Sequence, residues 1–215
     1  MGFKNKLASA SRWVLLIFIQ CCLSGSICTA EILKPFEERS NISTREKILN
    51  FSAVYAVQWS VYIIDQYDTI KKYGSFENWY EHPSDPHFDK DNLDYNLFMH
   101  TWVGQYYYLF YRSRGYLKQD SLIYSFLSSL TFEFTIETTT QQPSIQDCYQ
   151  TPVFGAVLGY WTEKFSHYLL GFGTVAGDTI AFLVNPFLIL PPTPDFVFSF
   201  SPTNDGVVMV GVWRF

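Results

Sequence analysis

The sequence predicts a mainly α-helical, membrane-associated bundle that ends in a small C-terminal β-hairpin. Two observations support the bundle: long apolar stretches carry polar residues at helical spacing, and aromatic residues make up 19% of the chain. A third supports the hairpin. Apolar and other residues alternate in 196–200 and 207–215, on either side of Thr203-Asn204-Asp205-Gly206, a sequence typical of a tight turn.

Residues 1–30 have the pattern of a cleavable secretory signal peptide. Lys4, Lys6 and Arg12 precede an apolar run too short to cross a bilayer, and small residues lead to a cleavage site after Ala30. We therefore expect an exported protein, located at the outer membrane or the periplasmic face of a bacterial cell envelope. Cleavage would remove three basic residues and take the formal net charge from −5 to −8, which argues against nucleic acid as a partner.

The segment 31–44 is expected to be a polar lead that ends with Ser43 or Thr44 as a helix cap. Residues 45–190 are predicted to form one helical, aromatic-rich domain, followed by the hairpin segment 191–215. The expected helices span 45 to about 67, a short piece near 76–80 inside a polar loop, 97–111, 120–137, a start at 144 or 151 up to 170, and 179–190.

None of these helices is a clean transmembrane span, because each is interrupted by polar residues that are costly in a bilayer unless they face one another. Two arrangements remain open: a bundle with a polar interior inside the membrane, or a soluble bundle that lies on it. Tyrosine and tryptophan suit the boundary between lipid and water, whereas the alternative explanation is a tyrosine-rich soluble core.

Polar or small residues recur along one face of three successive helices. In helix 97–111 and just beyond it they are His100, Gly104, Tyr107, Tyr111 and Arg114. In helix 120–137 they are Ser121, Ser125, Ser129, Glu133 and Glu137. In the next helix they are Asp147, Thr151, Gly155 and Gly159. We expect these faces to meet and to enclose a polar groove.

The candidate catalytic residues of this groove are His100, Glu133, Glu137 and Asp147. Glu133 and Glu137 lie one helical turn apart, which favours a shared proton, a cation or an Arg or His partner. Arg112 or Arg114 is expected at its mouth, and both join Ser129 and Ser144 as candidate ligand-binding residues. Simpler roles remain open: Asp147 as a helix cap with Ser144, and His100 as a hydrogen-bonded core residue. The pattern predicts no metal and no cofactor, since it holds no His-x-x-x-His motif or cysteine pair.

Several short motifs follow one another between Asn96 and Gly159. They are His100-x-x-x-Gly104 with Tyr107-Tyr108, Arg112-Ser113-Arg114-Gly115, Phe132-Glu133-Phe134 with Glu137, Pro143-Ser144-Ile145-Gln146-Asp147, and Gly155-x-x-x-Gly159. In order and spacing this third of the chain resembles the bacterial family known as domain of unknown function 3943. The chain departs from that family at Thr101, where a proline is usual, and at Tyr160, where an acidic residue is usual. The resemblance implies a Gram-negative envelope protein and no known activity. A fainter similarity to VanZ-like membrane proteins bears on architecture only.

The function predicted first is non-enzymatic: an envelope protein that binds lipid or an envelope protein partner through the polar groove. The alternative is a lipid- or glycan-modifying enzyme with Glu133 or Glu137 as general base, assisted by His100 and Asp147. Carboxylates one turn apart suit a glycosidase poorly, and the chain has no Gly-x-Ser-x-Gly motif for a serine nucleophile. A third possibility is that the last strand pairs within a larger assembly.

Overall fold

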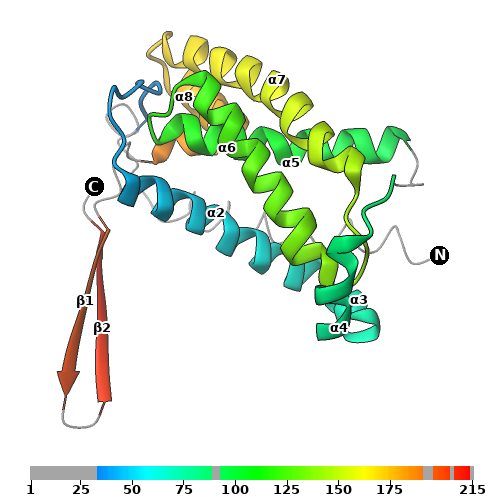
Figure 1. Cartoon of the computed structure of the whole chain (residues 1–215). Coiled ribbons are helices and arrows are strands. Elements are labelled where there is room, and N and C mark those ends of the chain that lie inside the picture. Colours follow the sequence, from blue (N-terminus) through cyan, green and yellow to red (C-terminus); the bar gives the residue numbers. More distant parts are fainter. Residues whose placement is uncertain (1–32, 89–92, 191–195, 204–205, 214–215) are drawn as a thin grey trace.

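The computed structural model describes residues 33–88, 93–190, 196–203 and 206–213, with side chains described for 33–88 and 97–190. This part of the chain is mainly α, with seven α-helices (Figure 1). The predicted signal peptide, 1–30, lies outside the described residues. Within them, no helix combines the length and the apolar character that a bilayer crossing requires.

The first described helix, α2 (Thr44–Asp65), is capped by Ser43, one of the two residues predicted for that role. The Ser43 hydroxyl accepts a hydrogen bond from the Glu46 N–H, and the Glu46 carboxylate accepts one from the Ser43 N–H, which completes a capping box. Two short helices follow, α3 (Tyr67–Tyr73) and α4 (Phe76–Glu81), with a 3-10 turn, η2 (His82–Ser84). The short helix expected near 76–80 is therefore present, and a second one precedes it.

Three long segments form the centre of the fold: α5 (Leu93–Ser113), α6 (Lys118–Thr131) and α7 (Ile145–Leu170). Contacts along α5 and α7 advance together, from His100 beside Asp147 to Arg112 beside Glu163, so these helices run parallel. The connecting α6 runs in the opposite direction and packs on both of them, and α2 lies along its other side (Figure 1). The third helix predicted from the sequence changes form: α6 passes into a π-helical turn, η3 (Phe132–Ile136), and a 3-10 turn, η4 (Glu137–Thr139).

The predicted limits 179–190 of the last helix are wrong. The helix α8 (Val175–Val184) starts one turn earlier, where the Thr174 hydroxyl accepts a hydrogen bond from the Gly177 N–H. It ends before Pro186, whose ring lacks the N–H that a continuing helix needs, and a 3-10 turn, η5 (Pro186–Ile189), follows. The polar lead crosses this end of the bundle: Leu33 and Phe36 pack on Leu169, Ala181 and Leu188.

The C-terminal backbone forms two antiparallel strands, β1 (Phe196–Thr203) and β2 (Gly206–Trp213), with Phe196 opposite Trp213 and Thr203 opposite Gly206. Residues 191–195 and 204–205 lie outside the described part.

The interior of the described bundle is more polar than apolar. Among the described residues, 21 polar or charged side chains are buried against 11 hydrophobic ones, while 33 large hydrophobic side chains are exposed. On α7 the two kinds occupy opposite faces. The buried face carries Asp147, Thr151, Gly155, Gly159 and Glu163. The exposed face, which we call the outer stripe, carries Ile145, Tyr149, Val153, Val157, Trp161 and Phe165, each between 37% and 62% exposed.

Candidate functional site

Glu133, Glu137 and Asp147 form a carboxyl cluster where η3 and η4 meet the start of α7. Glu133 is 1% exposed, and its Oε2 atom accepts a hydrogen bond of 3.0 Å from the Ser144 N–H. Ser144 in turn caps α7, because its hydroxyl accepts a bond from the Asp147 N–H at 3.3 Å. In a capping box the side chain three residues after the cap would bond the Ser144 N–H; here Glu133, from another element, does so. The π-helical turn is what places Glu133 there.

Burial in the bundle, together with the charge and the hydrogen bond of the neighbouring Glu137, raises the pKa of Glu133 to about 10. Glu133 is therefore a neutral acid at pH 7. A neutral carboxyl group is a hydrogen-bond donor as well as an acceptor, so one proton serves the Glu133–Glu137 pair. The shared proton that the one-turn spacing suggested is the arrangement most consistent with this geometry.

His100 joins the carboxyl cluster from α5. Its Nε2 atom lies 3.5 Å from Asp147 Oδ2, and its Nδ1 atom lies 2.9 Å from the Thr151 hydroxyl. The Asp147 backbone carbonyl also accepts a hydrogen bond from the Ser129 hydroxyl of α6, at 3.1 Å. The four candidate catalytic residues, together with Ser129 and Ser144, thus meet where α5, α6, η3 and α7 converge.

Arg112 and Arg114 do not lie at the mouth of this cluster, contrary to the prediction. Arg112 is twelve residues along α5 from His100, which is about 18 Å in a helix. It binds Glu163 through two hydrogen bonds, from Nε at 2.8 Å and from Nη2 at 2.7 Å. Arg114 points to another neighbour, since its Nε donates to the Asn50 side chain of α2 at 3.2 Å.

The predicted polar face of α5 divides into two faces in the structure. Tyr107 and Tyr111 contact α2 and α6, where they bond Gln58 and Ser128. The face toward α7 carries His100, Gly104, Tyr108 and Arg112, at intervals of four. It meets the buried face of α7, Asp147, Thr151, Gly155, Gly159 and Glu163, and we call the two faces together the polar seam.

Glu163 is a buried acidic residue that the sequence analysis does not predict as part of the site. Its side chain is 7% exposed and pairs with Arg112, whose side chain is 4% exposed. Arg112 also bonds Glu38 of the polar lead at 3.1 Å and the Tyr116 backbone carbonyl. The sequence carries a signal for this residue, because Glu163 continues the four-residue series of Asp147, Thr151, Gly155 and Gly159.

The polar seam is closed rather than open as a groove. A β-carbon added to Gly104 would lie 1.8 Å from the Thr151 carbonyl oxygen, and one on Gly155 would lie 2.3 Å from the Gly104 carbonyl carbon. His100 contacts Asp147 through one ring nitrogen and the Thr151 hydroxyl through the other, an arrangement like that of a catalytic triad. Thr151 is only 3% exposed, however, so a substrate could not reach its hydroxyl. Burial above all, with the nearby acidic groups of Glu133, Asp147 and Glu137, raises the pKa of Cys148 to about 12, which keeps its thiol unreactive. The described residues include no group of three or more His, Cys, Asp or Glu side chains placed to hold a metal ion.

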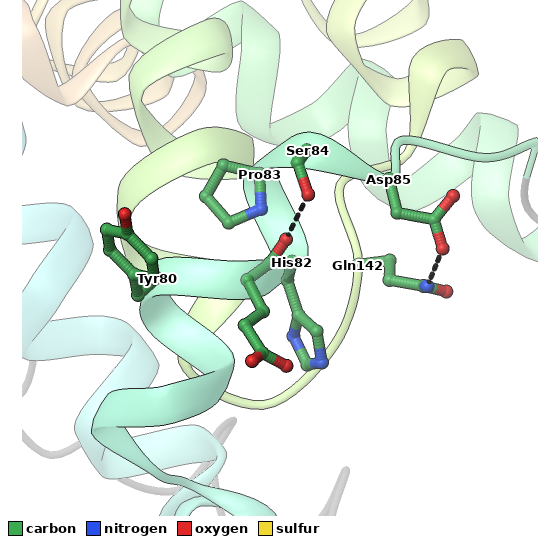
Figure 2. A pocket seen from close by; sticks show the side chains of 7 residues that line it. Tyr80, His82, Pro83, Ser84, Asp85 and Gln142 are labelled. Carbon is green, nitrogen blue, oxygen red and sulfur yellow. Dashed lines mark hydrogen bonds between the residues drawn. The ribbon is translucent and has the colours of Figure 1, made fainter.

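An open recess of about 770 Å³ lies outside the carboxyl cluster, between the η2 loop and Gln142 (Figure 2). The Gln142 side-chain amide donates to the Asp85 carboxylate, and His82 Nδ1 lies 3.0 Å from the Thr138 carbonyl oxygen. Farther along the loop, the His87 N–H donates to the Pro143 carbonyl, and the His87 carbonyl accepts from the Ile145 N–H. These hydrogen bonds hold the loop against the segment before α7 and the start of α7, so the polar groups of the loop that form them have a structural role.

The raised pKa of Glu133 predicts that the protein loses stability as the pH rises. Between pH 4.5 and about 10 the folded chain holds a proton that the unfolded chain releases, so the free energy of unfolding falls with pH. The slope from this group approaches about 1.4 kcal/mol per pH unit. Glu133→Gln keeps the acceptor for the Ser144 N–H and has no proton to lose. We expect the variant to equal its parent near pH 5 and to exceed it by at least about 1 kcal/mol at pH 8.

Urea unfolding in a mild detergent, repeated from pH 5 to pH 9, measures this difference. Glu77→Gln, which removes an exposed glutamate on α4, serves as the control and should leave the pH profile unchanged. A shift of the Glu133→Gln midpoint by the same amount at every pH would contradict the assignment of a neutral Glu133.

The family model described as Domain of unknown function (DUF3943) matches residues 85–187. The matched region includes α5, α6, α7 and α8, and with them the carboxyl cluster and the polar seam. The comparisons with curated proteins and with solved structures gave no match. The resemblance seen in the sequence motifs is thus confirmed, and residues 85–187 are a domain of the DUF3943 family.

Proposed function

We propose that this protein is an exported, non-enzymatic component of a bacterial cell envelope that binds membrane lipid. The lipid contact is the outer stripe of α7 with the neighbouring apolar surfaces of α5 and α6. The observation that carries the proposal is the reversal of polarity in these helices, with charged and hydroxyl side chains inside and aromatic and aliphatic ones outside.

Each half of this reversal has a physical reading. Single exposed apolar side chains are common on soluble proteins, but a continuous apolar surface marks a contact with lipid or with another protein. A polar interior with small residues at the helix contacts is how helices associate where the surroundings are as apolar as their side chains. On α6 the same division appears: Ser121, Ser125 and Ser129 are buried, while Leu122, Ile123 and Leu127 are exposed.

The polar seam then holds the bundle together, and the outer face makes the lipid contact. This differs from binding through a groove between the helices, because the seam is filled by its own side chains. The arrangement favoured is interfacial, with α7 lying in the plane of the membrane and its outer stripe turned toward the acyl chains. The outer membrane or the periplasmic face of the envelope is the proposed location, in keeping with the secretory signal expected at residues 1–30.

An enzyme that modifies lipid or glycan is the second candidate. The observation in its favour is a neutral acid, Glu133, on a π-helical turn close to His100, since such turns often occur at functional sites. The burial of Glu133 and Thr151 counts against it, because a substrate atom needs access to the acid that protonates it.

Fractionation of cells that express the full chain tests the membrane proposal. We expect the parent protein to stay in the envelope membranes through a carbonate wash. Val157→Asp, in the middle of the outer stripe, should release most of it, because a carboxylate in the acyl region costs about 2.5–3.5 kcal/mol. Asn41→Asp adds the same charge at an exposed position outside the stripe and should leave the distribution unchanged.

N-terminal sequencing of the membrane-bound product adds a second readout, for which the expected first residue is Glu31. A parent protein recovered in the soluble fraction, or equal retention of Val157→Asp and the parent, would overturn the lipid contact. The polar seam would then be an ordinary internal contact of a soluble protein.

A further inference from the structure

Two lysines from different helices converge on one aromatic ring at the surface of the bundle. Lys164 Nζ lies 4.8 Å from the centre of the Tyr160 ring and 5.6 Å from that of Trp161, both neighbours on α7. Lys118 is the first residue of α6, and its Nζ lies 5.5 Å from the Tyr160 ring centre. We call Lys118, Tyr160, Trp161 and Lys164 the cationic patch.

The cationic patch gathers two positive charges that no carboxylate in the described part of the chain pairs with. The ion pairs of the described part of the chain join Arg39, His100 and Arg112 to carboxylates, and neither patch lysine takes part in one. A hydrogen bond from Lys164 and the positive charges of Lys164 and Lys118 lower the pKa of the Tyr160 hydroxyl. Two like charges beside one ring repel each other unless an anion lies near them. In a chain with a net charge of −5, this local excess stands out.

The surroundings of the cationic patch are apolar. Leu117, Trp161 and Phe165 are 46%, 62% and 49% exposed, and the last two belong to the outer stripe. Lysine, tyrosine and tryptophan beside aliphatic and aromatic side chains are the residues that proteins place at the boundary between acyl chains and headgroups. An anion that comes with its own apolar tail fits such a surface, since one end pairs with the lysines while the other covers the stripe.

We propose that Lys118 and Lys164, with the Tyr160 hydroxyl, bind the phosphate of an anionic phospholipid headgroup where the outer stripe of α7 meets the membrane surface. This inference rests on the proposed lipid contact and adds to it the class of lipid and the position of the headgroup layer along α7.

Co-flotation of the full-length protein with vesicles tests the proposal. Vesicles of phosphatidylcholine alone are compared with vesicles of phosphatidylcholine and phosphatidylglycerol. The parent should bind both and prefer the anionic ones. Each lysine near an anionic surface strengthens binding about fivefold, so Lys118→Gln with Lys164→Gln should weaken binding to anionic vesicles by about 25-fold. Binding to phosphatidylcholine alone should not change.

Two matched variants isolate the cationic patch from net charge and from folding. Lys71→Gln with Lys72→Gln removes the same charge from α3, where Lys72 Nζ lies 4.7 Å from the Tyr73 ring centre, and should lose much less anionic binding. Lys118→Arg with Lys164→Arg keeps the charge and should retain the preference. Equal losses for the two Gln pairs, or a parent that binds both kinds of vesicle equally, would overturn the headgroup site alone. A parent that floats with neither kind would overturn the proposed lipid contact as well.

Discussion

Replacement of Arg112 by Met is expected to destabilise the protein by about 3–5 kcal/mol. The side chain of Arg112 is 4% exposed and that of Glu163 is 7% exposed, so the substitution leaves a carboxylate inside the bundle without its two hydrogen-bond donors. It also removes the donor to the Tyr116 carbonyl and the contact with Glu38 in the polar lead. Removal of one partner from a buried ion pair lowers the free energy of unfolding by more than the net contribution of the pair, because the remaining charge is neither hydrated nor paired.

A double-mutant cycle measured by urea unfolding separates these contributions. Arg112→Met with Glu163→Leu removes both charges and should recover much of the loss, short of the parent, because the Tyr116 carbonyl still lacks its donor. The control is Arg39→Met, since the Arg39–Glu46 pair has side chains 25% and 19% exposed and should be worth about 1 kcal/mol or less. A loss for Arg112→Met no larger than that for Arg39→Met would show that the pair does not hold the bundle.

The local features of the fold were predictable from the sequence because they depend on neighbouring residues. Ser43, one of the two expected caps, begins α2, and Ser144 caps α7 as the Ser144-x-x-Asp147 spacing indicated. The candidate site residues His100, Glu133 and Asp147 also meet as expected, since each lies on a polar face of an otherwise apolar helix. A buried polar side chain is stable only beside another polar group, so the polar faces of neighbouring helices are expected to pack against one another.

The partners along those faces were less predictable, because a helix has 3.6 residues per turn. Steps of three and four residues both return to nearly the same side, so the series from His100 could lead through Tyr107 or through Tyr108. One side of α5 packs on α7 and another packs on α6 and α2, so both series contact a neighbouring helix. Arg112 belongs to the series through Tyr108, which faces α7. No spacing in the sequence indicated the π-helical turn at Glu133, and none indicated that its carboxylate would accept a hydrogen bond from the Ser144 N–H.

Substitution of Gly104 by Ala is expected to cost about 3 kcal/mol or more, at the upper end of the range for overpacked cores. In an exposed helix this change would stabilise by about 1 kcal/mol, because alanine favours the helical backbone. Here the added β-carbon would lie 1.8 Å from the Thr151 carbonyl oxygen and 3.1 Å from the Gly155 α-carbon. Both contacts are with backbone, so no side chain can turn aside, and α5 and α7 must move apart.

That separation should also weaken the contacts at the two ends of the polar seam, since His100–Asp147 and Arg112–Glu163 both join α5 to α7. Gly171→Ala is the matched control: Gly171 has a helical φ of −62°, and the nearest atom to an added β-carbon is the Tyr168 carbonyl oxygen at 3.2 Å. It should change the urea midpoint little. A Gly104→Ala variant as stable as its parent would mean that α5 and α7 do not approach through their glycines, and the closed seam would have to be replaced by an open groove. The non-enzymatic proposal depends on this closure, so the stability of this variant bears directly on the choice between a lipid-binding protein and an enzyme.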